Sequence, residues 1–229
     1  MARECRHPFS LAYALNFASW VHLFRGEDYA AQEVADEVIA LATEDGFPFW
    51  MAFGTAFRGS ALAAQGRCDE GMAQIRQGLA ANRAIGTEMT RSYFLGVLAQ
   101  AHGQAGQIEE GLATVAEVLV FVEKSEERFY EAELYRLKGA LTLQSQAAGQ
   151  RSKVEDEAEG CFQKALDIAR QQEAKSHELR AATSLTRLWG ENKRKSEARE
   201  LLAPVYDWFT EGFDTPDLKD AKALLDELA

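Results

Sequence analysis

The sequence is poor in residues that break or cross-link a chain. It holds four prolines and three cysteines among 229 residues, and Cys5, Cys68 and Cys161 lie far apart with no CxxC motif. Neither a disulfide framework nor a zinc knuckle is therefore indicated. No apolar run approaches the roughly 18 residues of a membrane helix, and no basic segment precedes an apolar stretch near residue 1. We therefore expect a cytoplasmic protein with no membrane partner.

Basic residues are also few relative to acidic ones. The chain carries 25 Lys and Arg against 36 Asp and Glu, a formal net charge of −11. Because this balance repels a phosphate backbone, we expect no nucleic-acid partner. Hydrophobic residues make up 47% of the chain and charged residues 27%, which is ordinary for a folded protein and too apolar for a disordered one.

Motifs of catalysis are missing as well. The sequence contains no G-x-x-x-x-G-K-[ST] phosphate loop and no G-x-S-x-G nucleophile elbow. The His-Glu pair at 177–178 begins like a metalloprotease helix, but Ala181 stands where the second histidine would be. His22 and His102 share one repeat position, and Leu62 at the position between them indicates that this position packs apolar side chains. We therefore expect no enzyme, no cofactor and no metal site.

A helical repeat is what the sequence does contain. Apolar residues recur at i, i+3, i+4 and i+7, the period of an amphipathic helix. Glycines recur at an interval of forty residues, at Gly26, Gly66 and Gly106, and Gly46 and Gly86 follow the same interval half a period out of phase. Glycine commonly ends a helix in the left-handed conformation. The spacing predicts helices of roughly 16–18 residues, two to each repeat.

Small residues twelve positions apart support this register. They predict that the first helix (A) and second helix (B) of a hairpin approach closely. The pairs are Ser19 with Ala31, Gly59 with Gly71, and Ala99 with Gly111. Between the third and fourth repeats the step is 47 residues rather than 40, which predicts a loop insertion at 147–153.

The repeat register divides the chain into consecutive hairpins within a single domain, residues 1–229. We expect an all-α fold of about five hairpins followed by a capping helix. The predicted hairpins span 8–45, 47–86, 87–125, 127–173 and 175–212, and the capping helix spans 215–229.

The fourth hairpin carries the pattern Ala158-x-x-x-Phe162-x-x-Ala165-Leu166. This spacing resembles the tetratricopeptide repeat, although forty residues exceed the usual 34. The resemblance implies an all-α solenoid wound as a right-handed superhelix, with A helices lining a concave groove. It also implies a non-catalytic domain that binds proteins.

A second resemblance is to the C-terminal repeat region of large bacterial signalling ATPases, many of which carry a class III adenylate or guanylate cyclase domain. It covers nearly the whole chain from about residue 7, and five segments carry it: His7–Ala12, Tyr130–Gly139, Leu179–Leu185, Ala203–Tyr206 and Trp208–Thr215. The resemblance implies a sensor or partner-binding arm that regulates a nucleotide-dependent switch. Upstream ATPase or cyclase domains of a longer protein are then candidate partners.

The tetratricopeptide pattern, carried over residue by residue, assigns groove positions. The predicted groove residues are Tyr13, Asn16, Trp20, Phe53, Tyr93, Gln100, Glu133, Arg136, Arg180, Thr183 and Arg187. Aromatic and arginine side chains suit a peptide or protein partner, and arginine forks bind carboxylate or phosphate. The same groove could instead hold a small-molecule effector. The aromatic residues could also simply stack between repeats as core.

The first hairpin suggests a further surface. Residues 3–9 align with 43–49 at the forty-residue interval, so we expect the N-terminal face to be uncapped. Large apolar residues on that face, Phe9, Leu11 and Phe17, predict contact with a partner. The alternative function is therefore a module that forms homodimers through this face.

Overall fold

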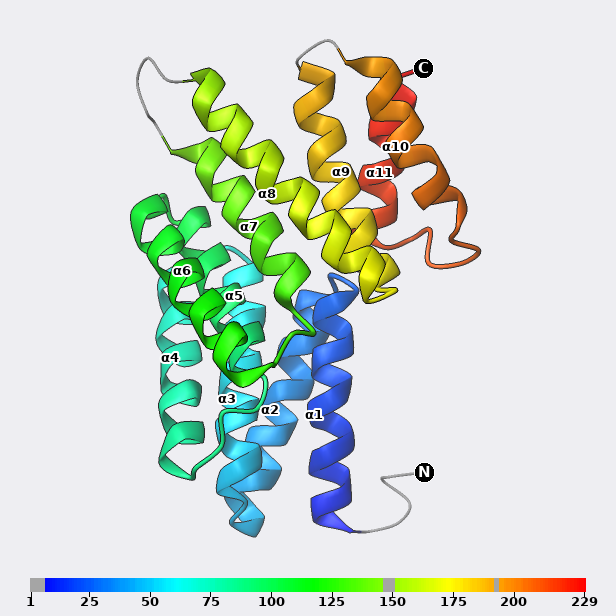
Figure 1. Cartoon of the computed structure of the whole chain (residues 1–229). Coiled ribbons are helices and arrows are strands. Elements are labelled where there is room, and N and C mark those ends of the chain that lie inside the picture. Colours follow the sequence, from blue (N-terminus) through cyan, green and yellow to red (C-terminus); the bar gives the residue numbers. More distant parts are fainter. Residues whose placement is uncertain (1–6, 146–150, 192–193) are drawn as a thin grey trace. The chain divides into compact units, whose positions relative to one another are not determined.

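The computed structural model describes residues 7–145, 151–191 and 194–229. Within these ranges every regular element is an α-helix, and there are eleven of them (Figure 1). They belong to two compact units, residues 1–107 (unit 1) and 108–229 (unit 2). Among the described residues, no helix is long and apolar enough to cross a lipid bilayer.

Unit 1 consists of helices joined by short turns. Its helices are α1 (Pro8–Phe24), α2 (Asp28–Asp45), α3 (Pro48–Ala64), α4 (Cys68–Ala84) and α5 (Arg91–Gln104). Consecutive helices pack against each other, and α3 also contacts both α1 and α5. The A helices α1, α3 and α5 therefore form one row, and the B helices α2 and α4 pack against it.

The helix ends follow the glycine series. All five glycines adopt the left-handed conformation, with φ between 69° and 85°, which confirms the predicted helix ends. Pro8 and Pro48 begin α1 and α3, where a missing N–H costs no helical hydrogen bond. The forty-residue series continues at Glu126, which takes φ 59° without being glycine.

The predicted small-residue contacts are present where both partners lie in one unit. Ser19 Oγ donates to the carbonyl of Ala31 at 2.8 Å, and both residues are fully buried. A Cβ built on Gly59 would lie 2.8 Å from the carbonyl oxygen of Gly71 and 2.7 Å from the backbone nitrogen of Ile75. Backbone therefore touches backbone between α3 and α4, and larger side chains do not fit.

Unit 2 repeats the same arrangement. Its helices are α6 (Ile108–Ser125), α7 (Glu131–Gln144), α8 (Arg151–Gln171), α9 (Lys175–Glu191), α10 (Lys195–Asp207) and α11 (Pro216–Glu227). Thr186 Oγ1 donates to the carbonyl of Ala198 at 3.1 Å, the same twelve-residue contact as in the first hairpin. Helices α7, α9 and α11 form the row of A helices, because α9 contacts both of the others.

The step from the third to the fourth repeat is seven residues longer than the others, and these seven residues fall between α7 and α8. A Cβ on Gly139 would lie 3.1 Å from the carbonyl oxygen of Ala158 and 2.6 Å from the ring of Phe162. This close approach links residues nineteen positions apart, seven more than in the other hairpins. Of the predicted loop at 147–153, residues 147–150 lie outside the described residues and 151–153 form the first turn of α8.

Helix α11 closes the apolar core of unit 2. Leu218, Ala221, Leu224 and Leu225 are buried where α11 packs against α9 and α10, and they belong to one core cluster with residues of α8, α9 and α10. At roughly 1.5–3 kcal/mol per buried leucine, this packing holds α11 firmly in place.

Candidate functional site

Five aromatic residues form a line along α1, called here the α1 stripe: Phe9, Tyr13, Phe17, Trp20 and Phe24. Their spacing of three or four residues puts them on one face of the helix. The ring centroids are 4.8 Å apart for Tyr13 and Phe17, 6.0 Å for Phe17 and Trp20, and 5.6 Å for Trp20 and Phe24. Phe9 is 47% exposed, Tyr13 53% and Phe24 38%.

Buried rings of α3 and α5 support the α1 stripe from behind. Tyr13 meets Trp50 edge-on at 5.7 Å, and Trp20 lies 5.6 Å from Phe57 and 5.1 Å from Tyr93. Trp50, Phe57 and Tyr93 are each at most 3% exposed. The exposed rings of Phe9, Tyr13 and Phe24 therefore pack on a layer of buried aromatic side chains.

The α1 stripe joins two sets of residues that the sequence assigned to different surfaces. Tyr13 and Trp20 were predicted in the groove, whereas Phe9 and Phe17 were predicted in self-association. Ring contacts join Tyr13, Phe17 and Trp20 directly, and Phe9 is linked to Tyr13 through Trp50, which both rings contact. Leu11, the third residue predicted for self-association, is half-buried on the same helix.

The other predicted groove residues of unit 1 differ in exposure. Phe53 is 1% exposed and Tyr93 3%, so burial favours the alternative in which these rings pack as core. Asn16 is also buried, and its Oδ1 has no hydrogen-bond partner. Gln100 is exposed on α5.

In unit 2, polar residues of three A helices converge on one buried carboxylate. The unit 2 ion network consists of Glu133 and Arg136 on α7, His177 and Arg180 on α9, and Asp217 on α11. Arg136 donates to Glu133 through Nε at 2.9 Å and Nη2 at 2.7 Å. Arg180 Nη1 and His177 Nδ1 each lie 3.9 Å from a Glu133 oxygen, and Arg180 Nε donates to Asp217 at 2.7 Å.

The network holds Glu133 ionised despite its burial. Burial alone would raise the pKa of Glu133, but the charge and hydrogen bonds of Arg136, then the charges of Arg180 and His177, outweigh it and bring the pKa to about 2. Burial lowers the pKa of His177, and the carboxylate of Glu133 only partly opposes this. The phenol of Tyr130 beside the network has a raised pKa because it is buried and faces Glu133.

Carboxylates of α11 neutralise the remaining arginines of the row. Arg180 pairs with Asp217, and Arg187 Nη2 donates to Asp220 Oδ1 at 2.7 Å with both side chains half exposed. Thr183 lies between the two arginines on α9 and is buried, and its hydroxyl has no hydrogen-bond partner. The arginine positions predicted for the groove are thus balanced by acids of unit 2 itself, and only the Arg187 pair lies open to solvent.

Sequence reasoning missed several of these residues. His177 entered it only as a rejected zinc ligand, and Asp217 and Asp220 lie on a helix beyond the repeat register. Their opposite charge to the arginines of α9 was visible, but no repeat pattern indicated which face of α11 meets α9. Trp50 was missed because its position in α1 is occupied by a small residue, Ser10.

His22 and His102, which share a repeat position, each contact the residue just before the next helix begins. His22 Nδ1 lies 2.5 Å from Glu27 Oε2, five residues downstream. His102 Nε2 accepts from Arg76 at 2.9 Å, so Nδ1 carries the hydrogen and donates to Gln107 Oε1 at 2.6 Å, again five residues downstream. Among the described residues, no group of three or more His, Cys, Asp and Glu side chains is placed to hold a metal ion.

The paired helices, the rows of A helices and the twelve-residue contacts define a tetratricopeptide-like helical-hairpin fold. In a comparison with solved structures, a crystal structure of a variant kinesin light chain-like protein from Podosopora anserina, with nearly identical TPR-like repeats, superposes with a TM-score of 0.56. The two are 18% identical, over 87% of this chain and 94% of that one. A second crystal structure under that name gives a TM-score of 0.54 at 16% identity, over 97% and 98% of the two chains.

At these identities, the likeness establishes the fold. The protein is an all-α, tetratricopeptide-like repeat solenoid, as the sequence predicted. No family model matches the chain, and no curated protein matches its sequence.

Proposed function

We propose that this chain is a non-catalytic protein-interaction or sensor domain of a bacterial signal-transduction protein, and that a peptide or protein partner binds the α1 stripe. One observation carries the proposal: a charge-free helix exposes aligned aromatic rings. Helix α1 contains no Asp, Glu, Lys or Arg, whereas 27% of the whole chain is charged. The cores of protein interfaces are likewise depleted in charge and enriched in aromatic residues.

Comparison with α3 indicates what kind of element could cover α1. Tyr13 and Phe53 share a repeat position, yet Tyr13 is 53% exposed and Phe53 1%. Val21 is 54% exposed, and its counterpart Ala61 is fully buried. Helix α3 has a B helix, α2, packed before it, as the contacts of Gly54 with Val38 illustrate. A helix from a partner could occupy the corresponding place beside α1.

The alternative occupant is a second copy of this chain. In that case Phe9, Leu11 and Phe17 would meet their own counterparts across a two-fold axis, and the domain would act as a homodimerisation module. The same exposed rings favour this reading. A small-molecule effector domain remains the third candidate, and it needs an enclosed pocket instead of an open helix face.

The signalling context rests on the sequence resemblance. Segments such as Tyr130–Gly139 and Leu179–Leu185 are similar to repeat regions that accompany ATPase and class III cyclase domains. Those domains in a longer protein are therefore the partners we propose first, in the cytoplasm. In unit 2 we assign Glu133, Arg136, Arg180 and Thr183 to shaping the A-helix face, and we place Arg187, half exposed in its pair with Asp220, on the surface of that face.

The experiment compares two exposed tyrosines. Tyr13→Asp places a charge in the α1 stripe, and Tyr29→Asp places one on α2, where Tyr29 is 74% exposed. We expect the Tyr13 variant to lose a co-purifying protein by roughly tenfold or more in quantitative mass spectrometry, and the Tyr29 variant to retain it. Sedimentation velocity of the full chain distinguishes binding of a second copy from binding of a different protein. Equal retention by both variants, with an unchanged sedimenting mass, would refute the proposal.

A further inference from the structure

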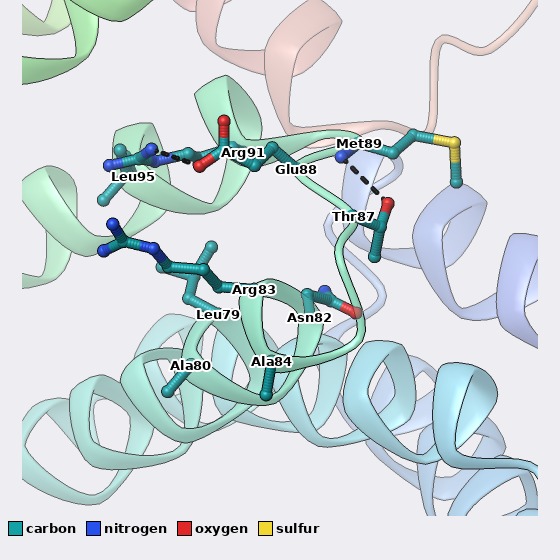
Figure 2. Close-up of a pocket in the computed structure, with 10 residues that line it drawn as sticks. All are labelled: Leu79, Ala80, Asn82, Arg83, Ala84, Thr87, Glu88, Met89, Arg91 and Leu95. Atoms are coloured by element: carbon teal, nitrogen blue, oxygen red, sulfur yellow. Dashed lines mark hydrogen bonds and ion pairs between the residues drawn. The ribbon is translucent and has the colours of Figure 1, made fainter.

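A pocket of about 420 Å³ lies within unit 1, between the end of α4 and the start of α5 (Figure 2). This volume is in the lower part of the roughly 300–1,000 Å³ range of small-molecule sites. Leu79, Ala80 and Ala84 of α4 and Leu95 of α5 supply apolar lining. The pocket is separate from the α1 stripe, so its occupant is not the partner proposed above.

Two arginines lie at one side of this pocket. Figure 2 shows the side chains of Arg83, from α4, and Arg91, from α5, extending in the same direction. Arg91 Nη1 binds Glu88 Oε1 at 2.7 Å. Within the described part of the chain, no acidic side chain pairs with Arg83, which is exposed. Arg83, whose charge no acidic side chain of the described residues neutralises, fits a single carboxylate.

Asn82 in the pocket wall is the second unusual feature. It is 3% exposed, and neither Nδ2 nor Oδ1 has a hydrogen-bond partner. The equivalent positions of the neighbouring repeats hold Ala42 and Val122, each 1% exposed. Its side chain lies beneath the segment of Thr87, whose backbone N–H already binds the Asn82 carbonyl at 3.0 Å (Figure 2). A buried primary amide with both atoms unpaired destabilises the free protein and complements a donor and acceptor pair, such as another amide.

We propose that this pocket binds a small amphipathic carboxylate that contains an amide, of the class of N-acyl amino acids. The acyl chain contacts Leu79 and Leu95, the carboxylate binds Arg83, and the amide pairs with Asn82 after that side chain turns toward the pocket. The domain then responds to a small molecule as well as to a protein partner.

Three related compounds test each part of this recognition with the full chain. N-octanoylglycine carries the acyl chain, the amide and the carboxylate. N-octanoylglycinamide lacks the charged carboxylate, and octanoate lacks the amide. We expect saturable one-site binding of N-octanoylglycine in calorimetry, with a rise in Tm, and roughly tenfold weaker binding of each of the other two. Absence of saturable binding, or equal binding of all three, would overturn the proposal.

Substitutions locate the binding. Arg83→Gln should weaken the binding of N-octanoylglycine by roughly tenfold and leave the Tm of the free protein unchanged. The control is Arg67→Gln, at an exposed arginine outside the pocket, which should bind N-octanoylglycine as the wild type does. Asn82→Val, the residue of the equivalent position 122, should raise the Tm of the free protein and weaken binding. Asn82→Ala serves as a second, smaller replacement. Binding unaffected by Arg83→Gln and by both Asn82 variants would contradict the assignment.

A further experiment with a peptide distinguishes a free small molecule from the C-terminus of a peptide, which presents the same chemical groups. A peptide that ends in an apolar residue with a free carboxylate also presents an amide and a carboxylate. If that peptide binds while N-octanoylglycine does not, the pocket is a peptide-end site and the proposal fails. If N-octanoylglycine binds and the peptide competes weakly or not at all, the proposal stands.

Discussion

Arg136 binds Glu133 with two hydrogen bonds, of 2.9 and 2.7 Å, from one turn further along the same helix, and Glu133 is only 2% exposed. An ion pair with the same spacing on an exposed helix surface contributes little to the stability of the fold. Here the carboxylate is buried against α9, and Arg180 and His177 of that helix also stabilise its negative charge. The pair therefore belongs to the interior of unit 2.

Removing the charge of Glu133 should destabilise unit 2 strongly. Glu133→Gln leaves the largely buried Arg136 without its carboxylate partner, while Arg180 keeps its ion pair with Asp217, and we expect a loss of about 3 kcal/mol in the free energy of unfolding. The matched control is Glu70→Gln, whose partner Arg67 is also three residues away but exposed. We expect the control to lose under about 0.5 kcal/mol in urea unfolding. Similar losses for the two variants would contradict the buried network.

The low pKa of Glu133 makes stability depend on acid. The folded group has a pKa of about 2 against an ordinary value of 4.5, so the unfolded chain binds the extra proton between these pH values. Stability from Glu133 is complete above about pH 4.5 and is lost as the pH falls toward 2. Between these values, the unfolding free energy of the wild type should fall by up to about 1.4 kcal/mol per pH unit more than that of Glu133→Gln. Parallel pH profiles for the two proteins would show that Glu133 titrates normally.

The contact of α3 with α4 leaves no space for a methyl group at Gly59. A Cβ there would meet backbone atoms at 2.7 and 2.8 Å, so we expect Gly59→Ala to cost about 2–3 kcal/mol. Gly160 in α8 has nothing within 4 Å of its Cβ position, and Gly160→Ala should stabilise by about 0.5–1 kcal/mol. Thermal unfolding measures both. A tolerated alanine at 59 would mean that the two helices are farther apart than described.

A left-handed glutamate ends the B helix α6. Glu126 has φ 59° at the repeat position that Gly46 and Gly86 occupy in the preceding hairpins. Glu126→Gly should stabilise the protein by about 1 kcal/mol, because glycine carries no steric cost in this conformation. Glu123→Gly, three residues earlier inside the helix, should destabilise by about the same amount. Chemical denaturation that gives both changes the same sign would count against this helix end.

The fold was predictable because its signals are local. Glycines that need positive φ and small residues that let backbones touch recur at the repeat interval, so the helix ends and the contacts of Ser19 and Gly59 followed from spacing alone. The resemblance to tetratricopeptide repeats then named the arrangement of the hairpins.

The site was harder to predict because burial depends on neighbours in space. Tyr13 and Phe53 are equivalent in sequence, but within the part of the chain that the structure describes a helix packs before Phe53 and none packs before Tyr13, so one ring is open and the other is core. The acids opposite Arg180 and Arg187 come from α11, outside the repeat. Asn82 carried a signal, an amide among apolar counterparts, that repeat comparison could have revealed.

Site-specific photocrosslinking from the α1 stripe tests the central claim most directly. A photoreactive phenylalanine analogue replaces Tyr13 in one protein and Tyr29 in another, since both side chains are exposed. We predict one discrete adduct, with a partner or a second copy, from position 13 alone, and its suppression when Phe17→Asp is added. Adducts of equal yield from both positions, or none from position 13, would contradict the account.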